Sequence, residues 1–154
     1  MLSTNEFQVV LHGVGRNLNR AYRTCEAFGV TSIRLHQCDG RLAGHLYRAA
    51  GRVALAPIDA LPTGVGVLAL ETGYPTPLWA VPWESMRWLL IGGETCGLPR
   101  KLEAACKARI MTLGNVSGLT VEAALAIALY ERSRCFEAGG RVRYEHISTT
   151  DGAA

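Results

Sequence analysis

The stretch LLIGGETCGLP, residues 89–99, decides the fold class. An apolar run ends there in the glycine pair Gly92-Gly93, and Glu94 and Gly97 follow before the next predicted element. Glycines in this place let the backbone approach a ligand or another segment closely. An ordinary tight turn with Glu94 in solvent fits the isolated segment equally well. The stretch therefore predicts a buried strand that ends in a close turn, where a ligand can bind.

Similar apolar segments recur along the chain and alternate with helical ones. Strands are predicted, in chain order, at residues 7–14, 32–38, 53–58, 65–71, 87–93 and 108–113. Residues 77–83 form an edge strand or a loop, because Pro77 and Pro82 interrupt that run. Helices are predicted at residues 17–29, 39–51, 98–107 and 119–139. Near-continuous apolar strands between helices favour an α/β fold, a parallel sheet with helices on both faces.

The length and composition predict one globular domain. The chain has 154 residues, enough to bury its own core, and 49% of them are hydrophobic while 19% are charged. That balance excludes a disordered protein. We expect a single domain over residues 1–140. The tail over residues 141–154 is polar and ends in small residues, so we expect it to be partly disordered.

The positive charge is concentrated in the first part of the chain. Residues 1–60 contain seven arginines and four acidic residues, whereas residues 61–154 contain nine basic and nine acidic ones. The net charge of +3 therefore comes from the N-terminal part. A local basic surface of this kind attracts polyanions such as nucleic acids.

Several classes of protein are not indicated by the sequence. The five cysteines lack C-x-x-C spacing and paired histidine ligands, so we expect neither a metal site nor a disulfide framework. The opening residues MLSTNEF do not read as a signal peptide. No apolar run approaches the roughly 20 residues that span a bilayer. We therefore expect a cytoplasmic protein without a membrane segment.

Ligands of parallel sheets bind at the carboxyl ends of the strands, so the loops there are candidate sites. The loop GVGRNLNRAYRT follows the first predicted strand and opens a helix, without the glycine spacing or lysine of the common phosphate loops. Asn17 fits the N-cap of this helix. Arg20 and Arg23 lie one turn apart, where they would repel unless an anion lies between them. A solvated arginine pair is the alternative interpretation.

A third candidate loop precedes the last predicted helix. The segment RIMTLGNVSGLTVEAALAIALYE, residues 109–131, combines a strand, a six-residue loop rich in Gly, Asn and Ser, and a helix. The helical part AALAIAL is small and apolar on almost all sides. Such a helix packs against a sheet or against a second subunit. A core helix without a functional role is the default interpretation.

Taken in order, the three segments resemble the three signature motifs of the TrmH-like branch of the SPOUT superfamily of RNA methyltransferases. The first motif, N-x-G-x-x-x-R-T-x-x-x-F-G, is matched apart from Asn19 in place of its glycine, by Asn17, Arg23, Thr24, Phe28 and Gly29. The second motif, G-x-E-x-x-G-L, is matched completely by Gly92, Glu94, Gly97 and Leu98. The third motif, with its apolar stretch and Y-E, is matched by Ile110, Gly114, Val116, Leu119, Val121, Tyr130 and Glu131. The resemblance covers residues 7 to about 135.

This resemblance implies a fold and an activity. Its fold is an α/β domain with a deep C-terminal trefoil knot, an exception to the rule that chains avoid knots. Members bind S-adenosylmethionine in the knot, act as homodimers and methylate a ribose 2′-oxygen of tRNA or rRNA without a metal. The knot loops here would follow Leu70, Ile91 and Leu113. The implied cofactor-binding residues are Leu70, Glu71, Gly92, Glu94, Gly97, Ile110, Thr112 and Leu119.

The resemblance also implies catalytic and RNA-binding residues. Arg23 corresponds to the family arginine beside the target ribose, and we expect it to hold the phosphate and orient the 2′-hydroxyl. We do not expect it to act as a base, because a guanidinium is almost never deprotonated in proteins. Glu94 would hold that arginine or a loop backbone in a dry pocket. Asn17 and Thr120 complete the catalytic candidates, and Arg16 and Arg20 join Arg23 as RNA contacts.

The third motif departs from the family where the chemistry takes place. Gly118, Thr120 and Glu122 replace a serine, an asparagine and a serine, and Met111 and Thr112 replace a proline and a methionine. In one interpretation the protein is an active 2′-O-methyltransferase in which Thr120 or Ser117 covers for the missing groups. In the other it is a non-catalytic RNA-binding or regulatory protein. An unrelated nucleotide-binding domain is a third alternative. Because no added RNA-binding domain is visible, as in the smallest TrmH-like members, tRNA is the expected substrate.

Overall fold

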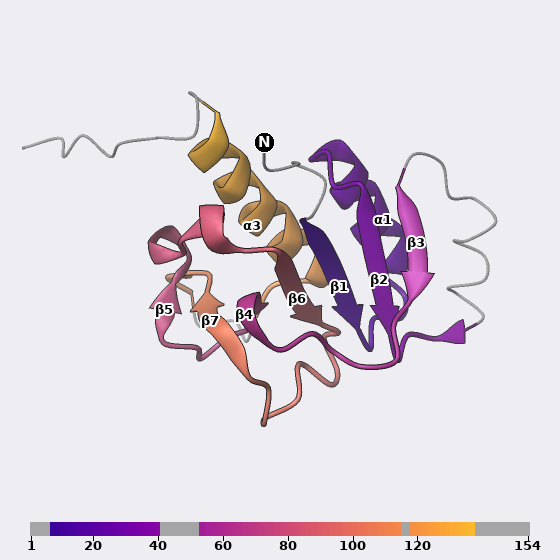
Figure 1. Ribbon diagram of the computed structural model, residues 1–154. Helices are drawn as coiled ribbons and strands as arrows, with labels where there is room; N and C mark the ends of the chain where they lie inside the picture. The colour runs from indigo at the N-terminus through magenta and orange to yellow at the C-terminus, as the bar shows by residue number, and fades with distance from the viewer. Residues whose placement is uncertain (1–6, 41–52, 115–117, 138–154) are drawn as a thin grey trace, which may run out of the picture.

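The computed structural model describes residues 7–40, 53–114 and 118–137. Seven strands and two α-helices follow one another there, with two short 3₁₀ helices between β5 and β6 (Figure 1). The strands are β1 (Gln8–His12), β2 (Ser32–His36), β3 (Ala54–Pro57), β4 (Gly64–Leu70), β5 (Thr76–Pro77), β6 (Trp88–Gly92) and β7 (Ala104–Arg109). The helices are α1 (Leu18–Ala27), η2 (Leu78–Ala80), η3 (Trp83–Ser85) and α3 (Val121–Phe136).

The seven strands form one parallel sheet in the order β3-β2-β1-β6-β4-β7-β5. Figure 1 shows this order from β3 on the right to β5 on the left. Val9 of β1 faces Ile33 of β2 on one side and Leu89 of β6 on the other. Because all strands are parallel, the carboxyl ends of β1, β4, β6 and β7 meet at one edge of the sheet. The expectation of a parallel α/β sheet is confirmed.

One face of the sheet is covered by both α-helices. Val9, Leu11, Leu68, Leu89 and Ile91 point to this face and are buried in one cluster with side chains of α1 and α3. The helices also contact each other. Their buried residues are Leu18, Ala21, Tyr22 and Cys25 in α1 and Val121, Leu125, Ala128 and Leu129 in α3.

The opposite face of the sheet is covered differently. Val10, Ala69 and Leu90 point to it and pack against Leu98 and Leu102, which belong to the segment between β6 and β7. In the part of the chain that the structure describes, this face therefore carries an irregular segment where helices were expected on both faces. The helix predicted at 39–51 lies almost wholly outside the described residues, as do the tail 141–154 and the loop residues Val116 and Ser117.

The helix predicted over residues 98–107 is wrong. Residues 98–103 form turns, and β7 begins at Ala104. The sequence LPRKLEAACK is rich in helix formers, but Cys106 pairs with Leu68 and Ala108 with Leu70 in register with β4. Burial in the sheet thus overrides local helix propensity. The predicted strand 108–113 correspondingly ends at Arg109.

The other predicted elements agree with the structure within a few residues. The weak segment 77–83 has only β5 at its start and then turns into η2 and η3, as its two prolines indicated. The last helix begins at Val121 and its described part ends at Phe136. No helix among the described residues is long and apolar enough to cross a membrane.

Candidate active site

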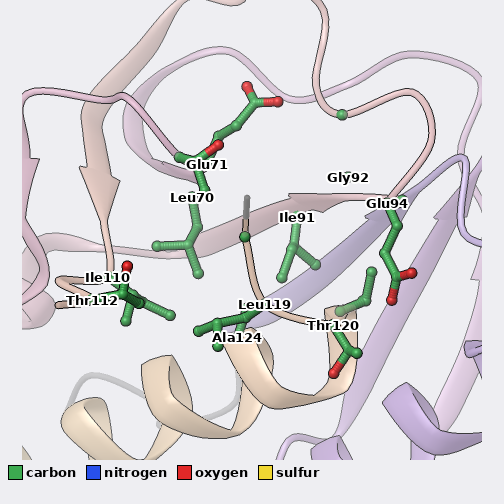
Figure 2. Close-up of a pocket in the computed structure, with 15 residues that line it drawn as sticks. Leu70, Glu71, Ile91, Gly92, Glu94, Ile110, Thr112, Leu119, Thr120 and Ala124 are labelled. Atoms are coloured by element: carbon green, nitrogen blue, oxygen red, sulfur yellow. The ribbon is translucent and has the colours of Figure 1, made fainter. Parts of the chain in front are cut away.

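A cavity of about 300 Å³ opens at the carboxyl edge of the sheet, between the ends of β4, β6 and β7 and the start of α3. This is the low end of the range for small-molecule sites, about 300–1,000 Å³. Figure 2 shows Leu70 and Ile91 on one side of the cavity and Leu119 and Ala124 on the other. The described residues that line it are Leu70, Glu71, Thr72, Ile91, Gly92, Gly93, Glu94, Gly97, Ile110, Thr112, Gly118, Leu119, Thr120, Val121 and Ala124.

Two glycines of the second motif are required by close backbone packing. A Cβ on Gly92 would lie 2.6 Å from the carbonyl oxygen of Gly97, closer than real atoms pack. Gly97 has a φ of +60°, a backbone conformation that residues with a side chain rarely adopt. A Cβ there would also collide with Oε1 of Glu71. The turn after β6 therefore folds back on its own strand and forms one wall of the cavity, as the glycine pattern predicted.

The cavity has an apolar part and a polar rim. Leucine, isoleucine, valine and alanine side chains make the apolar part, and two threonines, Thr112 and Thr120, contribute hydroxyl groups. Glu71 and Glu94 are also among its lining residues, and no lysine, arginine or histidine lines it in the part of the chain that the structure describes. An apolar cleft with a few polar groups is the usual form of a small-molecule site.

Asn17 and Glu94 join the first and second motifs. The side-chain amide nitrogen of Asn17 donates to Oε1 of Glu94 at 2.9 Å. Asn17 occupies the N-cap position of α1, as expected, but its side chain makes no capping hydrogen bond. Glu94 is exposed, and its recorded partner among the described residues is Asn17 instead of Arg23. The expected ion pair in a dry pocket is therefore not observed.

Thr120 caps the last helix. Its Oγ1 accepts a hydrogen bond from the backbone N–H of Ala123 at 3.3 Å. A threonine at this position satisfies one of the free N–H groups at the helix start. The Thr120 hydroxyl can still donate its hydrogen toward the cavity that the residue lines. One side chain thus fixes the start of α3 and contributes a polar group to the cavity.

The three arginines of the first loop and α1 are exposed, but they are not equivalent. Arg20 donates to Oε1 of Glu122 at 3.3 Å and so links α1 to α3. The other oxygen of Glu122 is buried without a hydrogen-bond partner in the described residues. Arg23 and Arg16 make no recorded hydrogen bond or ion pair within the described ranges. They are the side chains on this surface that an external anion can reach without breaking a contact.

The structure brings most of the predicted site residues together. All eight predicted cofactor residues line the one cavity, with Thr120, whereas Asn17 contacts it only through Glu94 and the three arginines lie outside its lining. The roles of these residues remain predictions. Six lining residues were missed: Thr72, Ile91, Gly93, Gly118, Val121 and Ala124. Most are chain neighbours of predicted residues, and Ala124 follows Thr120 by one helical turn, so their spacing could have identified them.

A buried histidine pair, which the sequence did not predict, lies beside the site. Nδ1 of His12 lies 2.7 Å from Nδ1 of His36, and the two rings stack 4.9 Å apart. Burial and the neighbouring His36 lower the pKa of His12 below its ordinary value. The carbonyl of His12 accepts from the N–H of Gly93, so the pair adjoins the turn that lines the cavity. Each histidine is the last residue of its strand, β1 or β2, so the sequence could have predicted that the two lie close together at the carboxyl edge of the sheet.

The described residues contain no group of three or more His, Cys, Asp or Glu side chains placed to hold a metal ion. No protein-family model matches the sequence. No curated protein matches it at a significant level.

The structure is nevertheless similar to solved RNA methyltransferases. An S-adenosylmethionine-bound rRNA methyltransferase from Sinorhizobium meliloti is 28% identical with a TM-score of 0.70, over 87% of this chain and 58% of that one. A protein studied for the 2-OH methylation of C/U34 on tRNA is 26% identical with a TM-score of 0.66, over 87% of this chain and 92% of that one. A putative RNA methyltransferase from Bacillus anthracis shares the fold at 22% identity, with a TM-score of 0.68 over 90% and 99% of the two chains.

The chain thus spans less than two thirds of the first of these proteins and nearly the full length of the other two. The same fold carries the three motifs, and the residues of the second and third motifs surround one cavity. The chain is therefore similar in fold to RNA methyltransferases of the TrmH and SpoU type.

Proposed function

We propose that the protein is an S-adenosylmethionine-dependent RNA methyltransferase that modifies a ribose 2′-oxygen, with tRNA as its substrate. The observation that carries this proposal is the single cavity shared by the second and third motifs. Its walls come from three strand ends and one helix start that are distant in sequence. A pocket assembled in this way is the default ligand site of a parallel α/β sheet.

The cavity suits S-adenosylmethionine in shape and charge. Leu70, Ile110 and Leu119 offer apolar surfaces to an adenine ring, while the close turn at Gly92 and Gly97 exposes backbone groups beside it. The carboxylates of Glu71 and Glu94 favour a ligand that carries positive charge. When bound, the cofactor supplies a methyl group to a nucleophilic oxygen.

Arg23 is the proposed contact to the RNA phosphate next to the modified ribose. Its guanidinium is exposed on α1 and makes no recorded contact within the described residues, so it is available to an anion. A guanidinium donates in a fixed fork that matches phosphate oxygens and keeps its proton, so Arg23 positions the ribose without accepting the hydroxyl proton. Arg16 extends the same surface, whereas Arg20 is committed to Glu122 unless RNA displaces that contact.

The substrate is proposed from the solved structures that this chain resembles. The match covers 92% of the protein studied for C/U34 methylation on tRNA and 58% of the rRNA methyltransferase. By this similarity we propose tRNA as the substrate and a ribose as the modified group, and we also propose that the protein acts in the cytoplasm.

A homodimer and a trefoil knot are part of the same proposal. Ile127 and Tyr130 lie one turn apart on α3 and are 41% and 61% exposed, and Trp79 of the adjoining η2 is 56% exposed. Exposed apolar side chains grouped in this way mark a contact surface. A second copy would cover them, and the loops after Leu70, Ile91 and Leu113 would form the knot. Sedimentation velocity at micromolar concentration should show a dimer, and a monomer would contradict this part.

A non-catalytic RNA-binding protein is the second candidate. It is favoured by Gly118, which brings no hydroxyl to the cavity, and by Glu122, whose carboxylate is paired with Arg20. Losing one positioned polar group slows an enzyme by about 10²–10³-fold, which leaves measurable turnover. The active enzyme is therefore the proposal that we carry forward.

The test is methyl transfer from tritiated S-adenosylmethionine to purified RNA. The protein is incubated with bulk tRNA and, separately, with rRNA, and labelled RNA is digested with alkali, which does not cleave next to a 2′-O-methyl group. The proposal predicts label in tRNA that survives as alkali-resistant dinucleotides. Label in alkali-sensitive mononucleotides would contradict ribose methylation. RNA binding without any label would favour the non-catalytic candidate.

A further inference from the structure

Glu71 and Glu94 line the candidate cofactor pocket, and among the described residues no basic side chain lines it with them. Glu71 follows β4 and Glu94 follows β6, on two walls of the cavity (Figure 2). We propose that Glu71, with Glu94, makes the pocket selective for the positively charged sulfonium cofactor over the neutral thioether product. This inference rests on the proposed function and adds a specificity-determining residue that discriminates by charge.

Glu71 is held in place by its surroundings. Its Oε1 accepts a hydrogen bond from the backbone N–H of Leu98 at 3.2 Å. The same oxygen packs so closely on Gly97 that a Cβ there would collide with it. A hydrogen bond also joins Glu71 to Tyr74; burial first, and then the charge of Glu71 and this bond, raise the pKa of the Tyr74 phenol. The carboxylate is thus fixed between β4 and the turn after β6.

Among the described residues, no ion pair neutralises the charge of Glu71. Two cations of β7 are associated with Tyr74, but both are engaged there. Nζ of Lys107 lies 5.5 Å from the centre of the Tyr74 ring, and Arg109 donates to the carbonyls of Tyr74 and Pro75 at 2.9 and 2.5 Å. Neither cation lines the cavity. Glu94 has the neutral amide of Asn17 as its recorded partner among the described residues.

The two cofactor forms differ by one unit of charge at the sulfur. S-adenosylmethionine carries a sulfonium cation, whereas S-adenosylhomocysteine has a neutral thioether and is otherwise the same apart from the lost methyl group. A fixed carboxylate attracts a cation a few ångströms away, and the attraction is stronger near the surface of a protein than in bulk water. Removing the Glu71 charge should therefore weaken binding of the sulfonium form by about tenfold. After methyl transfer the same charge no longer holds the product, which can leave.

The experiment compares three ligands on the Glu71→Gln variant by calorimetric titration. Glutamine keeps the length of the side chain and an oxygen that accepts from Leu98, but it carries no charge. S-adenosylmethionine and sinefungin, an analogue with an amine in place of the methylsulfonium group, are both cationic at the relevant position. Their affinities should fall about tenfold, while the affinity for S-adenosylhomocysteine should change less than about twofold.

The controls separate charge from structure. Tyr74→Phe removes the phenol that contacts Glu71 but keeps the carboxylate, so the preference for the cationic ligands should stay. Glu103→Gln removes an exposed charge outside the cavity lining and should change nothing. If Glu71→Gln weakens all three ligands equally, Glu71 only supports the turn, and the inference is overturned. Unchanged affinities for all three would overturn it as well.

A measurement on the unaltered protein keeps the test decisive if the variant does not fold. Added salt screens charge interactions at a partly exposed site. Raising sodium chloride from 0.05 to 0.5 M should lower the affinity for S-adenosylmethionine more than the affinity for S-adenosylhomocysteine. An equal decrease in both affinities would contradict the inference. If the unaltered protein binds neither ligand, with or without tRNA, the proposed function fails instead.

Discussion

The side-chain amide of Asn17 donates to the carboxylate of Glu94 at 2.9 Å, across 77 positions of sequence. Asn17 follows β1 and Glu94 follows β6, the two strands that pair at the centre of the sheet. The contact therefore connects the helix that carries Arg23 to the turn that lines the cavity. It is the direct physical link between the proposed RNA surface and the proposed cofactor pocket.

This link predicts coupling between the two residues. Asn17→Ala and Glu94→Ala should each lower kcat/KM for tRNA methylation, because each removes the same hydrogen bond. The loss of transition-state stabilisation in the double variant, calculated from kcat/KM, should be smaller than the sum of the losses in the two single variants. The difference is a coupling free energy of about 1 kcal/mol. Initial rates of all four proteins provide the measurement. Strict additivity would show that the contact does not serve the reaction.

Arg23→Ala should remove methylation and leave cofactor binding nearly intact. The side chain is exposed on α1 and lies outside the lining of the cavity. Loss of its phosphate contact should lower kcat/KM by at least about 10²-fold. Arg100→Ala, which removes an exposed arginine from the segment before β7, is the matched control and should stay active. Equal loss of S-adenosylmethionine affinity and of activity in Arg23→Ala would contradict the assigned role.

Gly92→Ala should close the pocket. The added methyl group would meet the backbone of Gly97 and Leu98, so the turn after β6 must move at a cost of about 1–3 kcal/mol in unfolding free energy. We expect more than tenfold loss of S-adenosylmethionine affinity. Gly40→Ala is the control, because a Cβ there meets nothing within 4 Å. Unfolding in urea and calorimetric titration give the two quantities, and a variant with normal affinity would refute the packing argument.

The His12–His36 pair should make the fold sensitive to mild acid. The folded pKa of His12 is lowered from 6.5, first by burial and then by the charge of His36. The unfolded chain therefore binds more protons, so this contribution is present above pH 6.5 and is lost as the pH falls. The slope for one group is at most about 1.4 kcal/mol per pH unit. Urea unfolding between pH 5 and 8 should show a free energy of unfolding that falls with falling pH. The His12→Gln variant should show a weaker dependence on pH.

The fold was predictable where the strands are apolar and continuous. Val9 and Leu89 both belong to such runs and pair at the centre of the sheet. The prediction failed over residues 98–107, where local composition favours a helix but Cys106 and Ala108 are used as β7. Local propensity is weak compared with burial in a sheet, and only the folded structure supplies that term.

The site was predictable where one residue type is physically required. Gly92 and Gly97 are needed because no Cβ fits, and such positions are visible in a sequence. The partner of Glu94 was not visible, because side-chain contacts depend on how two loops approach each other. Arg20 illustrates the same limit, since its ion pair with Glu122 spans 102 positions and joins α1 to α3.

Calorimetric titration with S-adenosylmethionine tests the central claim most directly. The account predicts micromolar binding at one site per chain, lost in Gly92→Ala and kept in Arg23→Ala. Bulk tRNA is added in a second titration to allow for a pocket that closes only on RNA. No binding at millimolar ligand in either titration would contradict the assignment of this cavity as the cofactor site.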